Sequence, residues 1–191
     1  MSDSKLMVVV ASTRPGRKGP AVASWFLPFA RQHGAFDVEL VDLAELNLPF
    51  LDEPEHPSAR KYQHEHTRAW SARVEAADAF VFVTPEYNYG FPAPLKNALD
   101  FVFHEWKHKP VGFVSYGGIA AGTRSVQMLK QVVTALSMMP VAASVNLPGF
   151  TKSFGPDGAF APGEPAARSA KAMLDELAKW SAALKRMRAG A

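Results

Sequence analysis

Short apolar runs recur along the chain, and segments with the spacing of helices separate them. Four runs are continuous and rich in β-branched or aromatic residues, which is typical of strands buried on both faces of a parallel sheet. A fifth run alternates apolar and polar residues and therefore predicts a strand nearer the edge of the sheet. The continuous runs cover residues 6–11, 79–84, 111–115 and 140–145, and the alternating run covers residues 36–43.

Five segments with helical periodicity alternate with these strands, which predicts an α/β fold. This alternation favours a doubly wound three-layer sandwich, with helices on both faces of the sheet and right-handed crossovers. A chain of 191 residues fits one domain, so residues 1–191 are expected to form a single unit. The expected helices cover residues 20–32, 58–75, 93–105, 124–138 and 164–188.

Two connecting segments show neither the periodicity of a helix nor the apolar pattern of a strand. Residues 45–60 contain Pro49, Pro54 and Pro57 and predict a long loop after the second strand. Loops of this length often bind ligands or act as lids. Residues 147–165 form a second irregular connection. In doubly wound sheets, ligands bind outside the carboxyl ends of the strands, where the strand order reverses. We therefore expect the chemistry in the loops after the first, third and fourth strands.

The composition narrows the chemistry further. Hydrophobic residues make up 48% and charged residues 20% of the chain, as in an ordinary globular protein. The absence of cysteine excludes disulfides, thiolate metal ligands and cysteine nucleophiles, so redox chemistry requires a bound cofactor. The net charge of +3 is spread along the chain, which argues against a nucleic-acid partner. No apolar stretch approaches the ~20 residues that cross a bilayer, and the short polar N-terminus predicts a cytoplasmic protein without a membrane partner.

The segment after the first strand combines hydroxyl groups, glycines and cations. A predicted helix follows it directly, and a helix N-terminus offers unpaired backbone N–H groups and a favourable dipole to a phosphate. Ser12 and Thr13 add hydroxyl donors, and three basic residues add positive charge for a dianion: Arg14, Arg17 and Lys18. We therefore predict a site for a terminal phosphate. The alternative is an ordinary surface turn with solvated cations.

Two common nucleotide motifs are missing from this segment. It has neither the G-x-x-x-x-G-K-[ST] of P-loop NTPases nor the G-x-G-x-x-G of dinucleotide folds. Asp42, at the end of the second strand, occupies the place where a dinucleotide fold has its ribose-binding acid. Without the glycines, Asp42 is better interpreted as a strand-end residue or a helix cap. The sequence therefore favours a mononucleotide that ends in a phosphate.

The loops after the third and fourth strands offer surfaces for a planar ring. Tyr87 and Tyr89 lie beside Gly90 and three prolines, which predicts a rigid loop with a flat apolar face and available backbone N–H groups. Gly117 and Gly118 follow the fourth strand and permit close approach of the backbone to a ligand. A planar heteroaromatic ring fits between the two loops.

Three motifs at these strand ends match a known family. S-T-R-x-G-R follows the first strand, T-P-E-Y-N-x-G-x-P-x-x-L-K-N-A-x-D follows the third, and S-x-G-G follows the fourth. Together they resemble the NADPH-dependent FMN reductase family over residues 6–145, and the second motif is the most specific. The resemblance implies a flavodoxin-like fold with a five-stranded parallel sheet in the order 2-1-3-4-5.

The resemblance also implies cofactors and site residues. FMN is the expected bound cofactor, and NADPH or NADH is the expected hydride donor. Lys96, Asn97 and Asp100 match the family motif too, but their spacing on a helix indicates structural pairing. The expected FMN-binding residues are Ser12, Thr13, Arg14, Arg17 and Gly19 around the phosphate, Pro85, Glu86, Tyr87 and Asn88 along the isoalloxazine, and Ser115, Tyr116, Gly117 and Gly118 at its other border.

The implied function is that of an FMN-dependent NAD(P)H oxidoreductase. In this family, hydride passes from the nicotinamide to the flavin N5, and a small acceptor then replaces the nicotinamide. The acceptor is a flavin, a quinone, an azo compound or a metal oxyanion, and no protein side chain is an expected catalytic group. The resemblance implies a homodimer or homotetramer in which a neighbouring subunit closes the flavin site. Four aromatic residues suit either such an interface or the core: Phe91, Phe101, Phe103 and Trp106.

The sequence leaves other interpretations open. A flavodoxin-type single-electron carrier is usually strongly acidic, whereas this chain is basic, and a flavin-binding regulator without catalysis is a third alternative. An H-E-x-x-H pattern spans residues 104–108, but Pro110 indicates that the helix ends there, so we predict no metal site. We interpret His56, His64 and His66, in or beside the long loop, as exposed polar residues.

Overall fold

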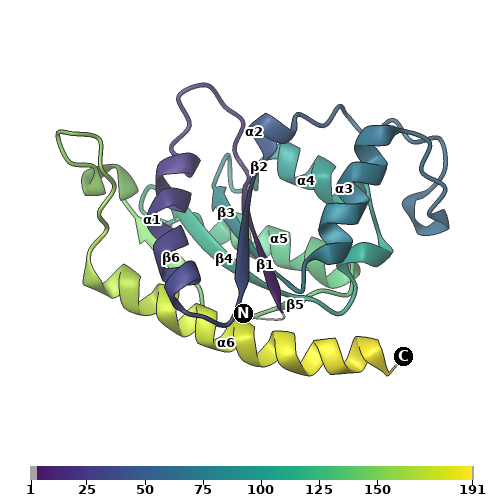
Figure 1. The fold of residues 1–191 in the computed structure, drawn as a ribbon. Coiled ribbons are helices and arrows are strands. Elements are labelled where there is room, and N and C mark those ends of the chain that lie inside the picture. The colour runs from purple at the N-terminus through teal and green to yellow at the C-terminus, as the bar shows by residue number, and fades with distance from the viewer. Residues whose placement is uncertain (1–3, 191) are drawn as a thin grey trace.

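A parallel β-sheet forms the centre of the molecule, and helices cover both of its faces (Figure 1). The computed structural model describes residues 4–190. The strands lie in the order β2-β1-β3-β4-β5, and the short β6 also pairs with β4. Each of these pairs is parallel. The strands are β1 (Lys5–Val10), β2 (Asp37–Asp42), β3 (Ala79–Pro85), β4 (Pro110–Gly117), β5 (Met139–Pro140) and β6 (Val145–Pro148).

The helices form one layer on each side of the sheet. α1 and α6 pack on one face, and α3, α4 and α5 pack on the other (Figure 1). The predicted three-layer sandwich with the strand order 2-1-3-4-5 is therefore confirmed. No helix in the described part of the chain is long and apolar enough to span a membrane. The helices are α1 (Gly19–Gln32), α2 (Leu43–Leu46), α3 (Glu65–Ala76), α4 (Ala93–Asp100), α5 (Thr123–Ala135) and α6 (Glu164–Ala189), with 3-10 turns η1 (Pro57–Ala59), η2 (His104–Trp106) and η3 (Phe150–Ser153).

The two covered faces explain why the central strands are continuously apolar. In β1, Met7 and Val9 pack toward α3 and α4, whereas Leu6, Val8 and Val10 pack toward α1 and α6. Successive side chains of a strand point to opposite faces, so every position of a strand covered on both sides is buried. β2 lies at the edge of the sheet and has several exposed residues, as its alternating pattern predicts.

The prediction of one continuous strand over residues 140–145 is wrong. The segment is divided between β5 and β6, which both pair with β4. The backbone N–H groups of Ala142 and Ala143 instead donate to the Glu176 carboxylate of α6, at 3.1 and 2.7 Å. These hydrogen bonds remove two amides from the ladder. A side chain so distant in the sequence leaves no signal in the local apolar pattern.

Three predicted helices are shorter in the structure, and the one predicted over residues 124–138 ends at Ala135 as α5. α3 begins later than predicted because the Glu53 carboxylate accepts hydrogen bonds from the backbone N–H groups of Gln63 and His64, at 2.8 and 3.0 Å. These contacts satisfy amides ahead of the helix and hold that segment outside it. α4 ends earlier than predicted, and η2 follows as a separate turn. Phe101 and Trp106 are buried in the core beside α4, so the interface alternative is wrong for these two residues.

Candidate functional site

The loops after β1, β3, β4 and β6 enclose a cavity of about 220 Å³ at the carboxyl edge of the sheet, which we call the cationic cavity. It lies where β1 and β3 adjoin and the strand order reverses, the position at which doubly wound sheets bind ligands. Four separate segments supply its lining. The lining residues are Arg14, Arg17, Lys18, Pro85, Glu86, Tyr87, Tyr116, Gly117, Gly118 and Phe150.

The turn between β1 and α1 brings the basic residues to this cavity. The Arg17 N–H donates to the Arg14 carbonyl at 3.0 Å and closes the turn. α1 then begins at Gly19, where a Cβ would lie 2.9 Å from Val10 Cγ1 and 3.0 Å from the Tyr116 hydroxyl. Glycine therefore allows the start of α1 to approach β1 and β4 this closely. A side chain at this position would push the turn away from the rest of the cavity wall.

Asp42 fixes the Arg17 guanidinium. Nη1 of Arg17 lies 2.7 Å from each carboxylate oxygen of Asp42 and also donates to the Ser12 carbonyl at 3.2 Å. Asp42 further accepts a backbone hydrogen bond of 3.0 Å from the first turn of α2, which confirms its prediction as a helix cap. Within residues 4–190, neither Arg14 nor Lys18 is ion-paired with a carboxylate, so the turn keeps a net positive charge.

A hydrogen bond joins the loop after β1 to the loop after β3. The fully buried Ser12 hydroxyl lies 2.6 Å from the Tyr87 hydroxyl. Tyr87 begins a tight turn in which its N–H and C=O both bond to Gly90 at 2.9 Å. Asn88 and Tyr89 occupy the middle of this turn with φ of 51° and 68°, as a type I′ turn requires. The turn thereby directs the Tyr87 side chain back toward the loop after β1.

The loop after β4 forms the opposite wall. Tyr116 is 3% exposed, and its ring centroid lies 4.9 Å from that of Phe150. Burial raises the pKa of Tyr116 above its usual value, so its hydroxyl stays neutral. At Gly117 a Cβ would lie 3.0 Å from the Gly122 nitrogen, whereas Gly118 has open space around it. This wall therefore presents aromatic and backbone surface rather than charge.

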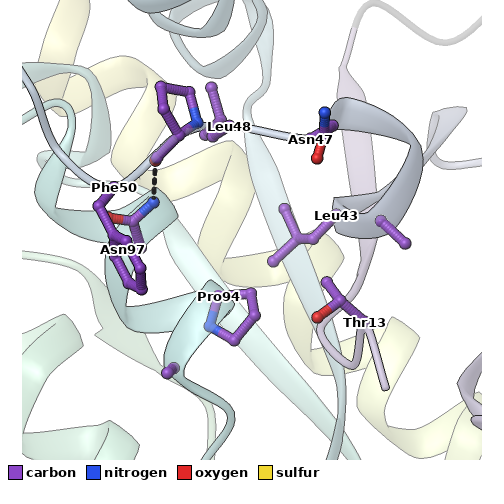
Figure 2. A pocket seen from close by; sticks show the side chains of 10 residues that line it. Thr13, Leu43, Asn47, Leu48, Phe50, Pro94 and Asn97 are labelled. Atoms are coloured by element: carbon purple, nitrogen blue, oxygen red, sulfur yellow. Dashed lines mark hydrogen bonds between the residues drawn. The ribbon is translucent and has the colours of Figure 1, made fainter. Parts of the chain in front are cut away.

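A second and larger cavity, of about 560 Å³, lies between the β1 loop, α2, the loop that follows α2, and α4 (Figure 2). We call it the uncharged cavity because none of its lining residues carries a charge. The Asn97 amide fixes its loop wall: it donates to the Pro49 carbonyl at 2.7 Å and accepts from the Leu51 N–H at 3.0 Å. The Phe50 side chain is 85% exposed. The lining residues are Thr13, Leu43, Ala44, Asn47, Leu48, Pro49, Phe50, Ala93, Pro94 and Asn97.

The structure brings most of the predicted site residues together. Ser12 and Gly19 lie behind the wall of the cationic cavity, against Tyr87 and Tyr116. Thr13 lines the uncharged cavity instead, Asn88 is exposed in the tight turn, and the Ser115 hydroxyl donates to Asn146 of β6 at 3.0 Å. The predicted residues that line the cationic cavity are Arg14, Arg17, Pro85, Glu86, Tyr87, Tyr116, Gly117 and Gly118.

Sequence reasoning missed one wall residue of the cationic cavity and most of the lining of the uncharged cavity. Phe150 follows β6, in the connection that was predicted only as irregular, and the Pro148-Gly149 pair after an apolar segment was the available signal. The uncharged cavity is built partly by the long loop predicted as a binding loop. The structural pairing predicted for the helix residues of the family motif is found between Lys96 and Asp100, at 2.5 Å. Asn97 instead ties that loop to α4 and also lines the uncharged cavity.

The H-E-x-x-H residues do not form the geometry of a zinc site. His104 and Glu105 lie in the short η2 turn, and the ring Nε2 of His104 bonds to the Ser58 carbonyl at 2.9 Å. Oε1 of the buried Glu105 accepts from the Tyr62 hydroxyl at 3.0 Å and the Ser71 hydroxyl at 2.8 Å. These partners give Glu105 a structural role.

The strand order and the cavity at the switch point define the flavodoxin-like class of α/β proteins. Among solved structures, the chain is similar to FerB, a flavoenzyme NAD(P)H:(acceptor) oxidoreductase from Paracoccus denitrificans. The TM-score is 0.75 at 20% sequence identity, and the match covers 94% of this chain and 97% of that chain. At this identity the likeness supports the fold.

The sequence comparisons then give the family. The model of the family described as NADPH-dependent FMN reductase matches residues 4–152. An NAD(P)H-dependent FMN reductase of Schizosaccharomyces pombe is 43% identical over 148 residues, which cover 75% of this chain and 74% of the relative. An NAD(P)H:quinone oxidoreductase of Solanum tuberosum is 34% identical over 105 residues, or 53% of this chain and 52% of the relative. The chain belongs to the NADPH-dependent FMN reductase family. The expected oxidoreductase class, with FMN and NAD(P)H as cofactors, is thereby confirmed.

Proposed function

We propose that this oxidoreductase holds FMN in the cationic cavity and the loops around it, and passes reducing equivalents from NAD(P)H to a small organic acceptor. The observation that carries the proposal is one cavity that combines the basic β1 loop with the glycine- and tyrosine-rich ends of β3 and β4. A phosphate and a planar ring joined by a short chain need these two kinds of surface side by side.

The β1 loop fits the phosphate of FMN. Because Asp42 neutralises Arg17, Arg14 and Lys18 supply two positive charges, which match a phosphate dianion. The first N–H groups and the dipole of α1 add to this attraction. In this assignment Arg17 positions the loop, through its bonds to Asp42 and to the Ser12 carbonyl. The hydroxyls predicted to bind the phosphate lie elsewhere, because Ser12 is bonded to Tyr87 behind the wall and Thr13 lines the uncharged cavity.

The loops after β3 and β4 fit the ring. Pro85, Glu86, Tyr87 and Asn88 would hold one border of the isoalloxazine, and the segment from Ser115 to Gly118 would hold the other. When bound, FMN supplies the two-electron chemistry that a chain without cysteine lacks. The residues of the protein bind and orient the reactants and limit the access of water.

The uncharged cavity supports a proposal for the acceptor. Its volume of about 560 Å³ lies within the range of about 300–1,000 Å³ typical of ligand sites. Its lining offers apolar surface with a hydroxyl and two amides, and it has no cation to balance an oxyanion. We therefore favour neutral quinones and azo compounds over metal oxyanions, a choice that the name of the Solanum tuberosum relative also supports.

The test uses purified protein reconstituted with FMN under anaerobic conditions. We expect that mixing with NADPH or NADH abolishes the visible flavin absorbance, and that a neutral quinone restores it. Comparison of the two nucleotides measures the donor preference. Protein that loses FMN on gel filtration, or that neither nucleotide reduces, would contradict the proposed function. Faster reoxidation by chromate than by a neutral quinone would contradict the acceptor class.

Assembly as a homodimer or homotetramer and a cytoplasmic location stay predictions. Three exposed apolar side chains support assembly with a second copy: Ile119 at 99%, Tyr89 at 63% and Met128 at 51% exposure. Light scattering coupled to gel filtration measures the mass in solution. A monomer at the concentrations used for assays would contradict the assembly.

A further inference from the structure

Glu86 carries a buried carboxylate oxygen that no described residue satisfies. The side chain is 7% exposed, follows β3 directly and lines the cationic cavity. Its Oε1 accepts a hydrogen bond from Arg124 Nε at 2.5 Å and is also paired with Arg124 Nη2. Its Oε2 is buried without a hydrogen-bond partner within residues 4–190. A buried carboxylate oxygen without a donor is costly, so this oxygen points to a donor that belongs to a ligand.

The surrounding structure holds this carboxylate in place. The Ser125 hydroxyl donates to the Pro85 carbonyl at 3.0 Å and fastens the first turn of α5 to the end of β3. Gly122 precedes α5 with φ of 79°, and a Cβ there would lie 3.0 Å from the backbone of Tyr116. α5 therefore begins close against both central strands. Glu86 follows Pro85 and Arg124 precedes Ser125, so each member of the pair is adjacent in the sequence to this hydrogen bond between rigid elements.

Tyr89 contacts Arg124, the other member of the ion pair. The guanidinium carbon of Arg124 lies 3.9 Å from the centroid of the Tyr89 ring, which is a cation–π contact. The hydrogen bond to Glu86 raises the pKa of Arg124, so the guanidinium is a permanent cation. Arg124 is 44% exposed, whereas the largely buried Glu86 is one of the residues that line the cavity. The cavity wall therefore presents a carboxylate whose negative charge is balanced by the Arg124 guanidinium.

We propose that Glu86 is a positioning residue for the flavin ring: its free Oε2 accepts a hydrogen bond from the N–H at the pyrimidine edge of the isoalloxazine, and Arg124 compensates its charge. The inference rests on the proposed binding of FMN in the cationic cavity. An isoalloxazine keeps this N–H in both oxidation states and gains electron density on reduction. A lone carboxylate beside it would disfavour the reduced form, and a lone guanidinium would favour it. The pair would thus fix both the place of the ring and its reduction potential.

The reduction potential of the FMN-loaded protein tests the charge compensation. We expect Arg124→Gln to lower the potential and Glu86→Gln to raise it, because each leaves the opposite charge unbalanced. Arg124→Lys keeps the charge and should stay close to the wild type, as should the double variant Glu86→Gln/Arg124→Gln. Shifts of the two single variants in the same direction, or no shift in either, would overturn the proposal.

FMN analogues test the hydrogen bond without any turnover. Titration by flavin fluorescence compares FMN with 3-methyl-FMN, which lacks the N–H. A hydrogen bond to a charged group contributes about 1.5–3 kcal/mol, so methylation should weaken binding to the wild type by about 10- to 100-fold. Glu86→Ala should bind both flavins alike. An equal loss on methylation in the wild type and in Glu86→Ala would overturn the hydrogen bond.

The outcomes distinguish this inference from the proposed function. Wild-type protein that binds FMN and is reduced by a nicotinamide nucleotide, with no shift of potential in its variants, would overturn only the role of Glu86 and Arg124. Wild-type protein that does not bind FMN would overturn both. If Glu86→Gln does not fold, as judged by circular dichroism, the contrast between Arg124→Gln and Arg124→Lys still decides the sign of the effect.

Discussion

The cationic and uncharged cavities adjoin the same loop after β1 but are built in opposite ways. The cationic cavity is small, and its lining combines three basic side chains and the carboxylate of Glu86 with aromatic and backbone surface. The uncharged cavity is larger, and apolar side chains with a few amides and a hydroxyl enclose it. The boundary falls between adjacent residues, since Thr13 lines the uncharged cavity and Arg14 lines the cationic one. One turn therefore supports two surfaces of distinct chemistry, one suited to a phosphate and one to a neutral ring.

Removal of two cations from the β1 loop should have the largest effect of the variants that distinguish the functions of the two cavities. The double variant Arg14→Ala/Lys18→Ala loses charge-assisted hydrogen bonds of about 1.5–3 kcal/mol each, so FMN affinity should fall roughly 100-fold or more. Fluorescence titration of FMN measures it. Lys171→Ala, on the exposed surface of α6, is the matched control and should bind as the wild type does. A loss in the double variant of less than about threefold would remove the phosphate assignment.

A methyl group at the start of α1 should damage the cationic cavity through its backbone. In Gly19→Ala the new Cβ meets Val10 and the Tyr116 hydroxyl, and overpacking of this kind costs about 1–3 kcal/mol. We expect a lower free energy of unfolding in urea together with weaker FMN binding. Gly190→Ala is the control, because its Cβ would meet its nearest atom at 3.7 Å, an ordinary contact. Unchanged stability in Gly19→Ala would show that the turn has room to relax.

Truncation of Phe50 should affect the uncharged cavity alone. Contact of a phenylalanine side chain with a ligand contributes up to about 1.5–3 kcal/mol, so Phe50→Ala should raise the KM for a neutral quinone by roughly tenfold. The FMN affinity should not change. Leu40→Ala, on the edge strand β2 and outside both cavity walls, is the control. A weaker affinity for FMN with an unchanged KM for the quinone would reverse the assignment of the two cavities.

The smallest expected effect concerns the pH dependence of stability. Burial raises the pKa of Tyr116 above the usual value of 10.0, so the unfolded chain releases this proton at a lower pH than the folded protein does. The contribution to stability is complete below pH of about 10 and is lost as pH rises above it. Urea unfolding of Tyr116→Phe should show a shallower alkaline loss than the wild type. An identical loss would show that other groups govern it, with Tyr62 as the first candidate, because burial also raises its pKa.

The fold was predictable because its strands are buried on both faces. Complete burial forces continuous apolar runs, as in Leu6 to Val10, and the alternation with helices then leaves few topologies. The division of the last predicted strand was not predictable, because it depends on Glu176 from α6. The delayed start of α3 depends in the same way on Glu53. Local periodicity carries no information about contacts of that range.

The candidate site likewise has features that were predictable from the sequence and features that were not. Residues of the loops at the strand ends were predictable, since glycines, prolines and cations at those places have direct physical meanings, and Asp42 was predictable as a cap. The bond between Ser12 and Tyr87, the pair of Glu86 with Arg124 and the Phe150 wall depend on how separate loops meet. The uncharged cavity was not predictable because it arises where Asn97 of α4 fixes a loop that follows α2.

The most direct test of the account is a comparison of FMN binding and quinone turnover in two variants of the reconstituted protein, Arg14→Ala/Lys18→Ala and Phe50→Ala. FMN affinity is measured by fluorescence titration, and the KM for a neutral quinone is measured at saturating FMN and NADPH. We expect the first variant to lose FMN affinity and keep its KM, and the second to keep its FMN affinity and bind the quinone more weakly. Equal effects of both variants on both quantities would contradict the assignment of the two cavities to cofactor and acceptor.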